Sequence, residues 1–141
     1  MKKLFLALFA VSTALTLGLS GCAGMKGPSD EELARQTCDA WAAALIAKDV
    51  EKFKATISDD FTSGQAEDKE ALCGFIQEAI DSGYLDEAEV VFENAAFTMA
   101  DGKCTVYPVD LSSAAGSVAA ELTLSKADGK WLVTGMEVDG L

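Results

Sequence analysis

The 141-residue chain contains no histidine, and its four cysteines include no Cys-x-x-Cys pair. Zinc sites need cysteine and histidine ligands at short spacings, and dithiol redox motifs need the paired cysteines. The acidic residues between Asp59 and Asp68 do not follow the alternating ligand pattern of a calcium loop, so helix capping and solvation explain them. We therefore expect no metal site, no cofactor and no chemistry that depends on an imidazole.

Basic residues are also scarce, with 11 Lys and Arg against 23 Asp and Glu. Two of the lysines, Lys2 and Lys3, belong to the N-terminal leader, and without them the net charge is −14. Such a surface repels nucleic acid and anionic head groups. This argues against nucleic acid and phosphate as partners and favours cationic ligands or basic protein faces, although solubility alone would explain the charge.

The chain has one long apolar run, residues 4–17, which follows Lys2 and Lys3 and precedes Leu19-Ser20-Gly21-Cys22. Its 14 residues fall short of the roughly 20 that a membrane-spanning helix needs. A basic start, a short apolar stretch and small residues before a cleavage site are typical of a secretory signal peptide. The Leu-Ser-Gly-Cys sequence resembles the lipobox of bacterial lipoproteins.

The lipoprotein resemblance implies that Cys22 carries diacylglycerol and becomes the first residue of the mature chain. It divides the sequence into a signal peptide (1–21), a lipidated tether (22–29) and one domain (30–141). Residues 23–28 reach about 20 Å at most, which keeps the domain close to a membrane. Ala23, where inner-membrane lipoproteins commonly have Asp, implies an outer membrane facing the periplasm in a Gram-negative envelope, or the outer face of the plasma membrane in a Gram-positive one.

Three cysteines remain beyond the lipobox: Cys38, Cys73 and Cys104. An envelope compartment permits disulfides, and an odd number leaves at least one thiol unpaired or bridged to another chain. The sequence leaves two alternatives open, one intramolecular disulfide of unassigned pairing or buried apolar thiols.

Helical periodicity is confined to the N-terminal half of the domain. A capping box at Ser29 and Glu32 begins a helix that runs to about Lys48. Asp49 and Asp68 are expected to cap a shorter second helix and a third helix that stops near Gly83. Each predicted helix carries one apolar stripe: Leu33, Cys38, Trp41 and Leu45; Val50, Phe53 and Ile57; Leu72, Phe75, Ile76, Ala79 and Ile80.

From Glu87 onward the apolar period changes to two, which predicts strands at 89–99, 104–111, 117–125 and 131–138. Asp101-Gly102 and Asp128-Gly129 separate strand pairs and favour tight hairpins. Pro108 cannot donate to a ladder, so its strand is expected at an edge or bulged there. Helices followed by an antiparallel sheet predict an α+β domain with the helices on one sheet face.

The domain resembles the nuclear transport factor 2-like superfamily, which includes SnoaL-like polyketide cyclases and ketosteroid isomerases. The resemblance covers about residues 30–139. It implies a cone-shaped α+β fold with three N-terminal helices packed on a curved antiparallel sheet of about four strands, a pocket open at one end, and dimers formed through the outer sheet face. The matching residues are Trp41, Ala44-Leu45, Asp49, Asp59-Asp60-Phe61, Gly129-Lys130-Trp131-Leu132-Val133 and Met136-Glu137-Val138.

The resemblance also implies that the chemistry of those enzymes is missing. The catalytic phenol of the isomerases falls at Trp41, whose indole is a donor without useful acid chemistry. The catalytic carboxylate falls at Gln65, an amide that cannot take a proton from carbon. A His–Asp dehydratase pair is impossible without histidine. We therefore expect a domain that is not an enzyme.

The expected pocket of the cone is lined by apolar side chains, with one acidic candidate. Val106, Pro108 and Asp110 would share the inner face of their strand, and Tyr107, Val109 and Leu111 would face outward. The alternative places Asp110 at a solvated strand end beside Ser112. The candidate ligand-binding residues are Trp41, Leu45, Phe53, Phe75, Phe97 and Asp110.

Three functions remain open at this point. The first is a membrane-anchored envelope lipoprotein, held through Cys22, whose domain binds a small apolar ligand without catalysis. The alternative is a protein-interaction subunit that forms a homodimer or docks on an envelope partner through Tyr107, Val109 and Leu111. A remote alternative is an enzyme that uses Asp110.

Overall fold

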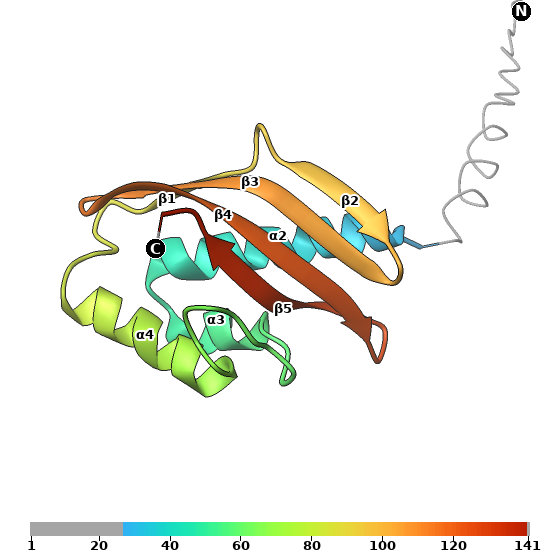
Figure 1. Ribbon diagram of the computed structural model, residues 1–141, viewed down its shortest axis with the longest axis horizontal. Coiled ribbons are helices and arrows are strands. Elements are labelled where there is room, and N and C mark those ends of the chain that lie inside the picture. The colour runs from blue at the N-terminus through green and yellow to red at the C-terminus, as the bar shows by residue number, and fades with distance from the viewer. Residues whose placement is uncertain (1–26, 141) are drawn as a thin grey trace, which may run out of the picture.

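The computed structural model describes residues 27–140, so Cys22 and its predicted lipidation lie outside the described residues. Three helices, α2 (Asp30–Ala47), α3 (Val50–Ala55) and α4 (Lys69–Asp81), precede all the strands. The strands are β1 (Glu89–Val91), β2 (Ala96–Ala100), β3 (Lys103–Ser113), β4 (Gly116–Ala127) and β5 (Lys130–Val138) (Figure 1). This order confirms the predicted α+β architecture.

The helices begin where the sequence predicts because polar side chains satisfy their first amide groups. The hydroxyl of Ser29 accepts from the Glu32 amide at 3.2 Å, and the Glu32 carboxylate accepts from the Ser29 amide at 2.7 Å, which confirms the capping box. Asp49 and Asp68 each accept from an amide in the first turn of α3 and α4, at 3.1 and 2.8 Å.

The sheet contains five antiparallel strands in the order β1-β3-β4-β5, and β2 pairs with the same side of β3 as β1. The prediction of one strand over 89–99 is therefore wrong, because the chain leaves β3 between Val91 and Ala96. The break lies opposite a bulge between Val106 and Val109 of β3. Pro108 has no amide hydrogen to donate there, and a bulge bends the strand.

The bulge also changes which side chains of β3 face the helices. Val106 and Val109 are both fully buried, so the prediction that Val109 faces outward is wrong. Because successive residues of a strand face opposite sides, Asp110 lies on the outer face, where it pairs in register with Val91 and Ala119. An extra residue in the strand, as in every bulge, reverses the alternation beyond it.

Both Asp-Gly pairs form tight turns with positive φ at each central residue, which confirms the two predicted hairpins: 53° and 75° at Asp101 and Gly102, and 51° and 77° at Asp128 and Gly129. The β4–β5 hairpin is bonded to the start of α2. The Lys126 ammonium and the Trp131 indole donate to Asp30 Oδ1 at 2.9 and 3.2 Å and hold the pKa of that carboxyl below its ordinary value.

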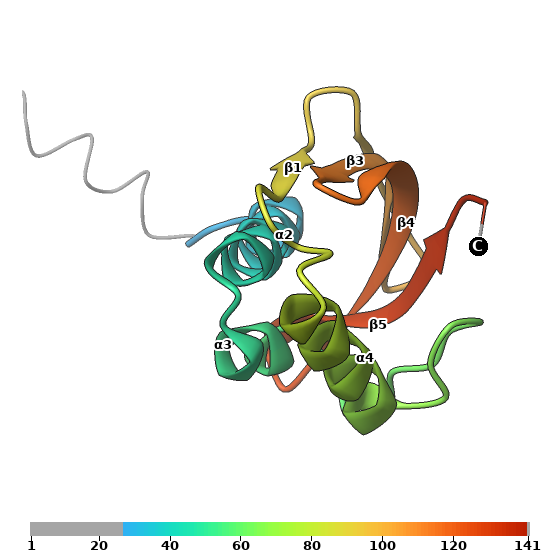
Figure 2. The ribbon, with the colours of Figure 1, turned by 90° about the vertical axis from the view of Figure 1, so that its left-hand side faces the viewer.

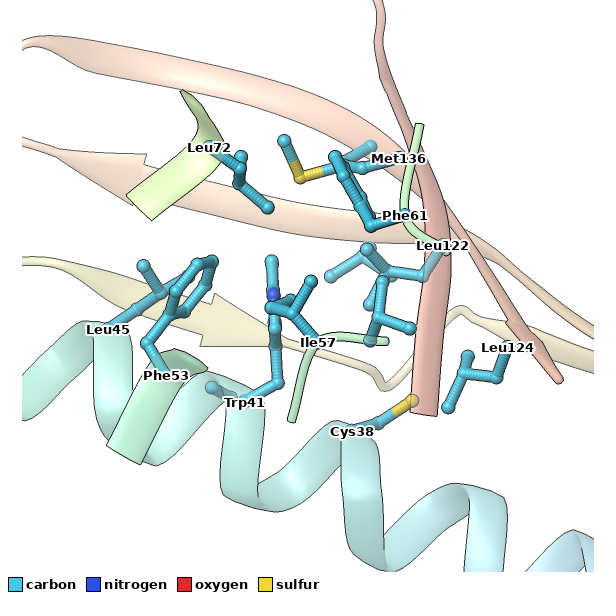
Figure 3. Close-up of a cluster of buried hydrophobic side chains, with 14 of the residues drawn as sticks. Cys38, Trp41, Leu45, Phe53, Ile57, Phe61, Leu72, Leu122, Leu124 and Met136 are labelled. Atoms are coloured by element: carbon cyan, nitrogen blue, oxygen red, sulfur yellow. The ribbon is translucent and has the colours of Figure 1, made fainter. Parts of the chain in front are cut away.

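The sheet is strongly curved, and α2 and α4 lie against its concave side (Figure 2). The space between the layers is filled by large apolar side chains, including Trp41, Phe53, Ile57, Phe61, Leu72 and Leu122 (Figure 3). The buried cluster runs from Ala34 to Met136 and joins residues of all three helices to residues of the sheet. Within the described range, no helix has both the length and the apolar character needed to cross a membrane.

The outer edge of β5 is covered by the chain that follows α3. The amide of Val133 donates to Thr56 O at 2.9 Å, and the carbonyl of Val133 accepts from the Ser58 amide at 2.8 Å. The amide of Thr62 donates to Thr134 O at 3.1 Å. Residues 56–62 therefore satisfy backbone groups that a free edge strand would expose.

Candidate functional site

A cavity of about 310 Å³ lies at the end of the cone where α2 and α4 finish. Its walls come from the second half of α2, the second half of α4, the segment that leads into β1, and the β3–β4 hairpin. Its volume is at the lower end of the range for small-molecule sites. Most of its lining is apolar, including Leu45, Ile76, Leu111, Val118 and Met136.

Trp41 supplies a buried polar group to the cavity wall, in addition to Glu89 and the serines at 112, 113 and 117. Its side chain extends from α2 toward the sheet (Figure 3) and is 1% exposed. Within residues 27–140, no acceptor bonds its Nε1. The ring packs against Phe53, with centroids 6.1 Å apart and planes tilted by 41°, which fixes its position. A buried N–H without an acceptor costs about 1–3 kcal/mol, so an acceptor brought by a ligand would recover that energy.

Three of the six predicted ligand-binding residues line this cavity: Trp41, Leu45 and Phe75. Phe75 lies at the rim and is 48% exposed, whereas the apolar stripe of its helix predicted burial. Phe53 is fully buried behind Trp41, where it supports the indole and does not line the cavity.

The other two predicted residues lie elsewhere. Phe97 belongs to β2 and lies beneath Arg35, whose guanidinium is 3.8 Å from the ring centroid, near the first half of α2. Asp110 lines a shallow outer groove with Val91 and Ala119, so the structure places it outside the cone. Gln65, the position that the resemblance gives to a catalytic carboxylate, is not among the lining residues either.

Sequence reasoning missed the wall opposite Trp41, which is built from Leu85, Val90, Leu111, Val118 and Val138. Val90, Leu111 and Val118 are neighbours in register across β1, β3 and β4. The alternation of side chains, counted along β3 without its bulge, placed Leu111 on the wrong face.

A second hollow of about 680 Å³ runs along the outer side of α2, beside α3 and the start of β5. It is a wide, open groove whose floor consists largely of small side chains such as Ala40, Ala43 and Ala47. A polar group in it, the Thr37 hydroxyl, already donates to Trp131 O at 2.6 Å. The less open cavity beside Trp41 is therefore the better candidate site.

Cys38, Cys73 and Cys104 are free, buried thiols. Of the two alternatives, an intramolecular disulfide or buried apolar thiols, the structure therefore contains the second. Burial, with a smaller contribution from nearby Cys104, raises the pKa of Cys38 to about 12. Burial likewise raises the pKa of Cys73 and of Cys104. Thiols held in the neutral form are poor nucleophiles and poor metal ligands. Over residues 27–140, no cluster of three or more Cys, Asp or Glu side chains could hold a metal ion.

No family model matches the chain, and no curated protein matches it. Several solved structures, however, are similar to it in fold. A protein of unknown function with a cystatin-like fold from Nostoc punctiforme PCC 73102 is 18% identical, with a TM-score of 0.61, over 74% of this chain and 85% of that one.

An NTF2-like protein of unknown function from Pseudomonas putida KT2440 is 15% identical, with a TM-score of 0.62, over 74% of this chain and 81% of that one. A de novo designed protein with a curved β-sheet is 19% identical, with a TM-score of 0.59, over 76% of this chain and 99% of that one. At these identities the likeness concerns the fold alone. The chain has an α+β fold of the NTF2-like type, with three N-terminal helices and a five-stranded antiparallel sheet.

Proposed function

We propose that this protein is a membrane-anchored envelope lipoprotein whose NTF2-like domain binds a small, mostly apolar molecule without transforming it. The observation that carries the binding function is an apolar cavity lined by Trp41, whose buried indole N–H has no acceptor among the described residues. A ligand with a carbonyl, ether or hydroxyl oxygen at its inner end would bury its apolar body in the cavity and accept from Trp41 once the side chains that cover Nε1 move aside.

The residues of the cavity support binding rather than catalysis. The indole of Trp41 donates a hydrogen bond but does not transfer a proton near neutral pH. Asp110, the carboxylate that an enzyme would have used, lies in the outer groove. Glu89, the acidic residue among the described lining residues, is exposed to solvent at the start of β1.

The position of the cavity suits a domain tethered through its N-terminus. The tether enters at Ser29, beside the β4–β5 hairpin, whereas the cavity begins at Trp41 and Leu45 on the same helix. Sixteen residues of helix separate Ser29 from Leu45, which is about 24 Å. A lipid on Cys22 would therefore hold the opposite end of the domain at the membrane and leave the cavity open to the aqueous phase.

Replacing Trp41 with phenylalanine tests the binding function. The probe is prodan, a neutral naphthyl ketone whose fluorescence reports on its surroundings, titrated into residues 27–141. We expect wild type to bind prodan and Trp41→Phe to bind it about 2- to 12-fold more weakly, which corresponds to the loss of one hydrogen bond of about 0.5–1.5 kcal/mol.

The control is the same titration with a naphthalene of similar size that lacks the carbonyl. Its affinity should change less than that of prodan, because it has no acceptor to lose. Equal losses for both probes would show that the variant alters packing and not a hydrogen bond. Failure of wild type to bind either probe would contradict the binding function itself.

Anchoring is tested separately in the host cell. Radiolabelled palmitate should be incorporated into wild type, and Cys22→Ser should abolish the label, because lipidation of a lipobox requires the thiol. Cys38→Ser, which removes a different thiol, should keep the label. Absence of label in wild type, or its persistence in Cys22→Ser, would refute the anchor and leave the cavity result untouched.

A further inference from the structure

The mouth of the cavity is acidic. Glu89 is the charged residue in its described lining, and none of the described lining residues is a lysine or arginine. Glu87, two positions earlier, is exposed and has a left-handed backbone with φ of 56°. Asp81 ends α4 at the same end of the molecule. Lys48 is already bonded to Asp86, so its charge is paired.

The helices add negative charge of their own. Both α2 and α4 line the cavity with their second halves, and both finish at its end of the cone (Figure 1). The C-terminus of a helix carries a partial negative charge equivalent to about half an electron, which basic residues in the last turn would normally offset. The last turn of α4 has no basic residue and its C-cap is Ser82, whereas the C-cap of α2 is Lys48, whose ammonium offsets the charge of that helix end.

An exposed aromatic ring completes the mouth. Phe75 on α4 is 48% exposed at the rim, and Val118 on β4, which also lines the cavity, is 39% exposed. These side chains leave apolar surface in contact with water at the entrance. An exposed phenylalanine ring that lines the same cavity as Glu89 is a favourable place for an ammonium group, because the electron-rich face of the ring attracts cations.

We infer that the ligand is a cationic amphiphile, with its apolar body in the cavity and its ammonium group at the mouth beside Phe75, Glu89 and the C-terminal half of α4. The inference rests on the proposed binding function and assigns the class of ligand. An anionic head group would meet Glu89 and the negative end of α4, with no basic partner among the described lining residues. A neutral molecule would bind through the apolar walls and Trp41 alone.

The test uses three naphthyl ketones that differ in the group at the far end of a short linker: trimethylammonium, hydroxymethyl or sulfonate. Affinities for residues 27–141 are measured by titration at low and at moderate salt. We expect the ammonium probe to bind about tenfold more tightly than the sulfonate probe, with the hydroxymethyl probe between them. Salt should reduce this ratio, because it screens exposed charges.

The double variant Glu87→Gln/Glu89→Gln should reduce the ratio of the ammonium-probe affinity to the sulfonate-probe affinity by about 3- to 10-fold. Its control, Asp101→Asn/Asp128→Asn, removes the same charge from the two hairpins at the tethered end, where asparagine accepts the positive φ. That control should leave the ratio unchanged.

The outcomes separate the two proposals. If the hydroxymethyl probe does not bind, the binding function fails whatever the charged probes do. If it binds but the ammonium and sulfonate probes bind equally, or the sulfonate probe binds more tightly, the cationic class is wrong and the binding function stands. An equal response to both double variants would show a general effect of net charge and would also overturn selection at the mouth.

Discussion

Replacing Leu122 with alanine is expected to lower the free energy of unfolding by about 2–5 kcal/mol. Leu122 lies in β4, which has a hydrogen-bonded neighbour on each side, and its side chain is fully buried. It belongs to the cluster that includes Ile57, Phe61 and Met136 between the sheet and the helices (Figure 3). Removing its isobutyl group leaves a void that a curved sheet, paired on both sides, cannot close.

The measurement is chemical denaturation of residues 27–141 monitored by circular dichroism. Glu121→Ala is the matched control, because Glu121 precedes Leu122 in the same strand and faces the other side of the sheet. Its substitution should change stability by about 0.5 kcal/mol or less. A loss below about 1 kcal/mol in Leu122→Ala would mean that the two layers are packed less tightly than the structure shows.

Cys38 is expected to react with a thiol reagent at pH 8 about a thousandfold more slowly in the native protein than in guanidinium chloride. The pKa of about 12 that burial gives Cys38, against an ordinary 9.0, lowers the fraction of thiolate by that factor. Mass spectrometry after pulsed labelling would identify the modified residue. Labelling of native Cys38 at the rate of the unfolded chain would show that the core opens readily near α2.

The same shift makes stability depend on pH in a definite direction. The folded-state pKa of Cys38 lies above the unfolded value, so the stability it contributes is complete below pH 9 and is lost as pH rises toward 12. The loss amounts to at most about 4 kcal/mol. The variant Cys38→Ala should lose less stability than wild type over this interval, and parallel curves would contradict the burial of an ionisable thiol.

Much of the fold was predictable because its signals are local. A capping box, two aspartate caps and two Asp-Gly turns depend on residues next to one another in the sequence, and all five lie where expected. The division of 89–99 into β1 and β2 was not predictable. It depends on Pro108 and the bulge in a neighbouring strand, which local periodicity does not report.

Part of the candidate site was also predictable, because it depends on residues that are close together in the sequence. Trp41 and Leu45 are spaced by one helical turn, and that spacing alone places both on the buried face of α2. Phe97 was misplaced because its strand ends at the tethered end of the cone, a fact set by pairing with β3. Of the two positions left open for Asp110, the structure has the one outside the cone, because one bulge reverses the faces of every later residue in its strand.

The covered edge of β5 has a consequence for assembly. Because residues 56–62 occupy backbone groups of β5 around Val133 and Thr134, another chain cannot lengthen the sheet at that point. At the opposite border of the sheet, the outer strands are β1 and β2, which are short and pair with β3 on either side of its bulge. This border therefore offers no long, straight strand with which another chain could pair. Across the described part of the chain, both borders thus oppose the strand-by-strand growth that leads to fibrils.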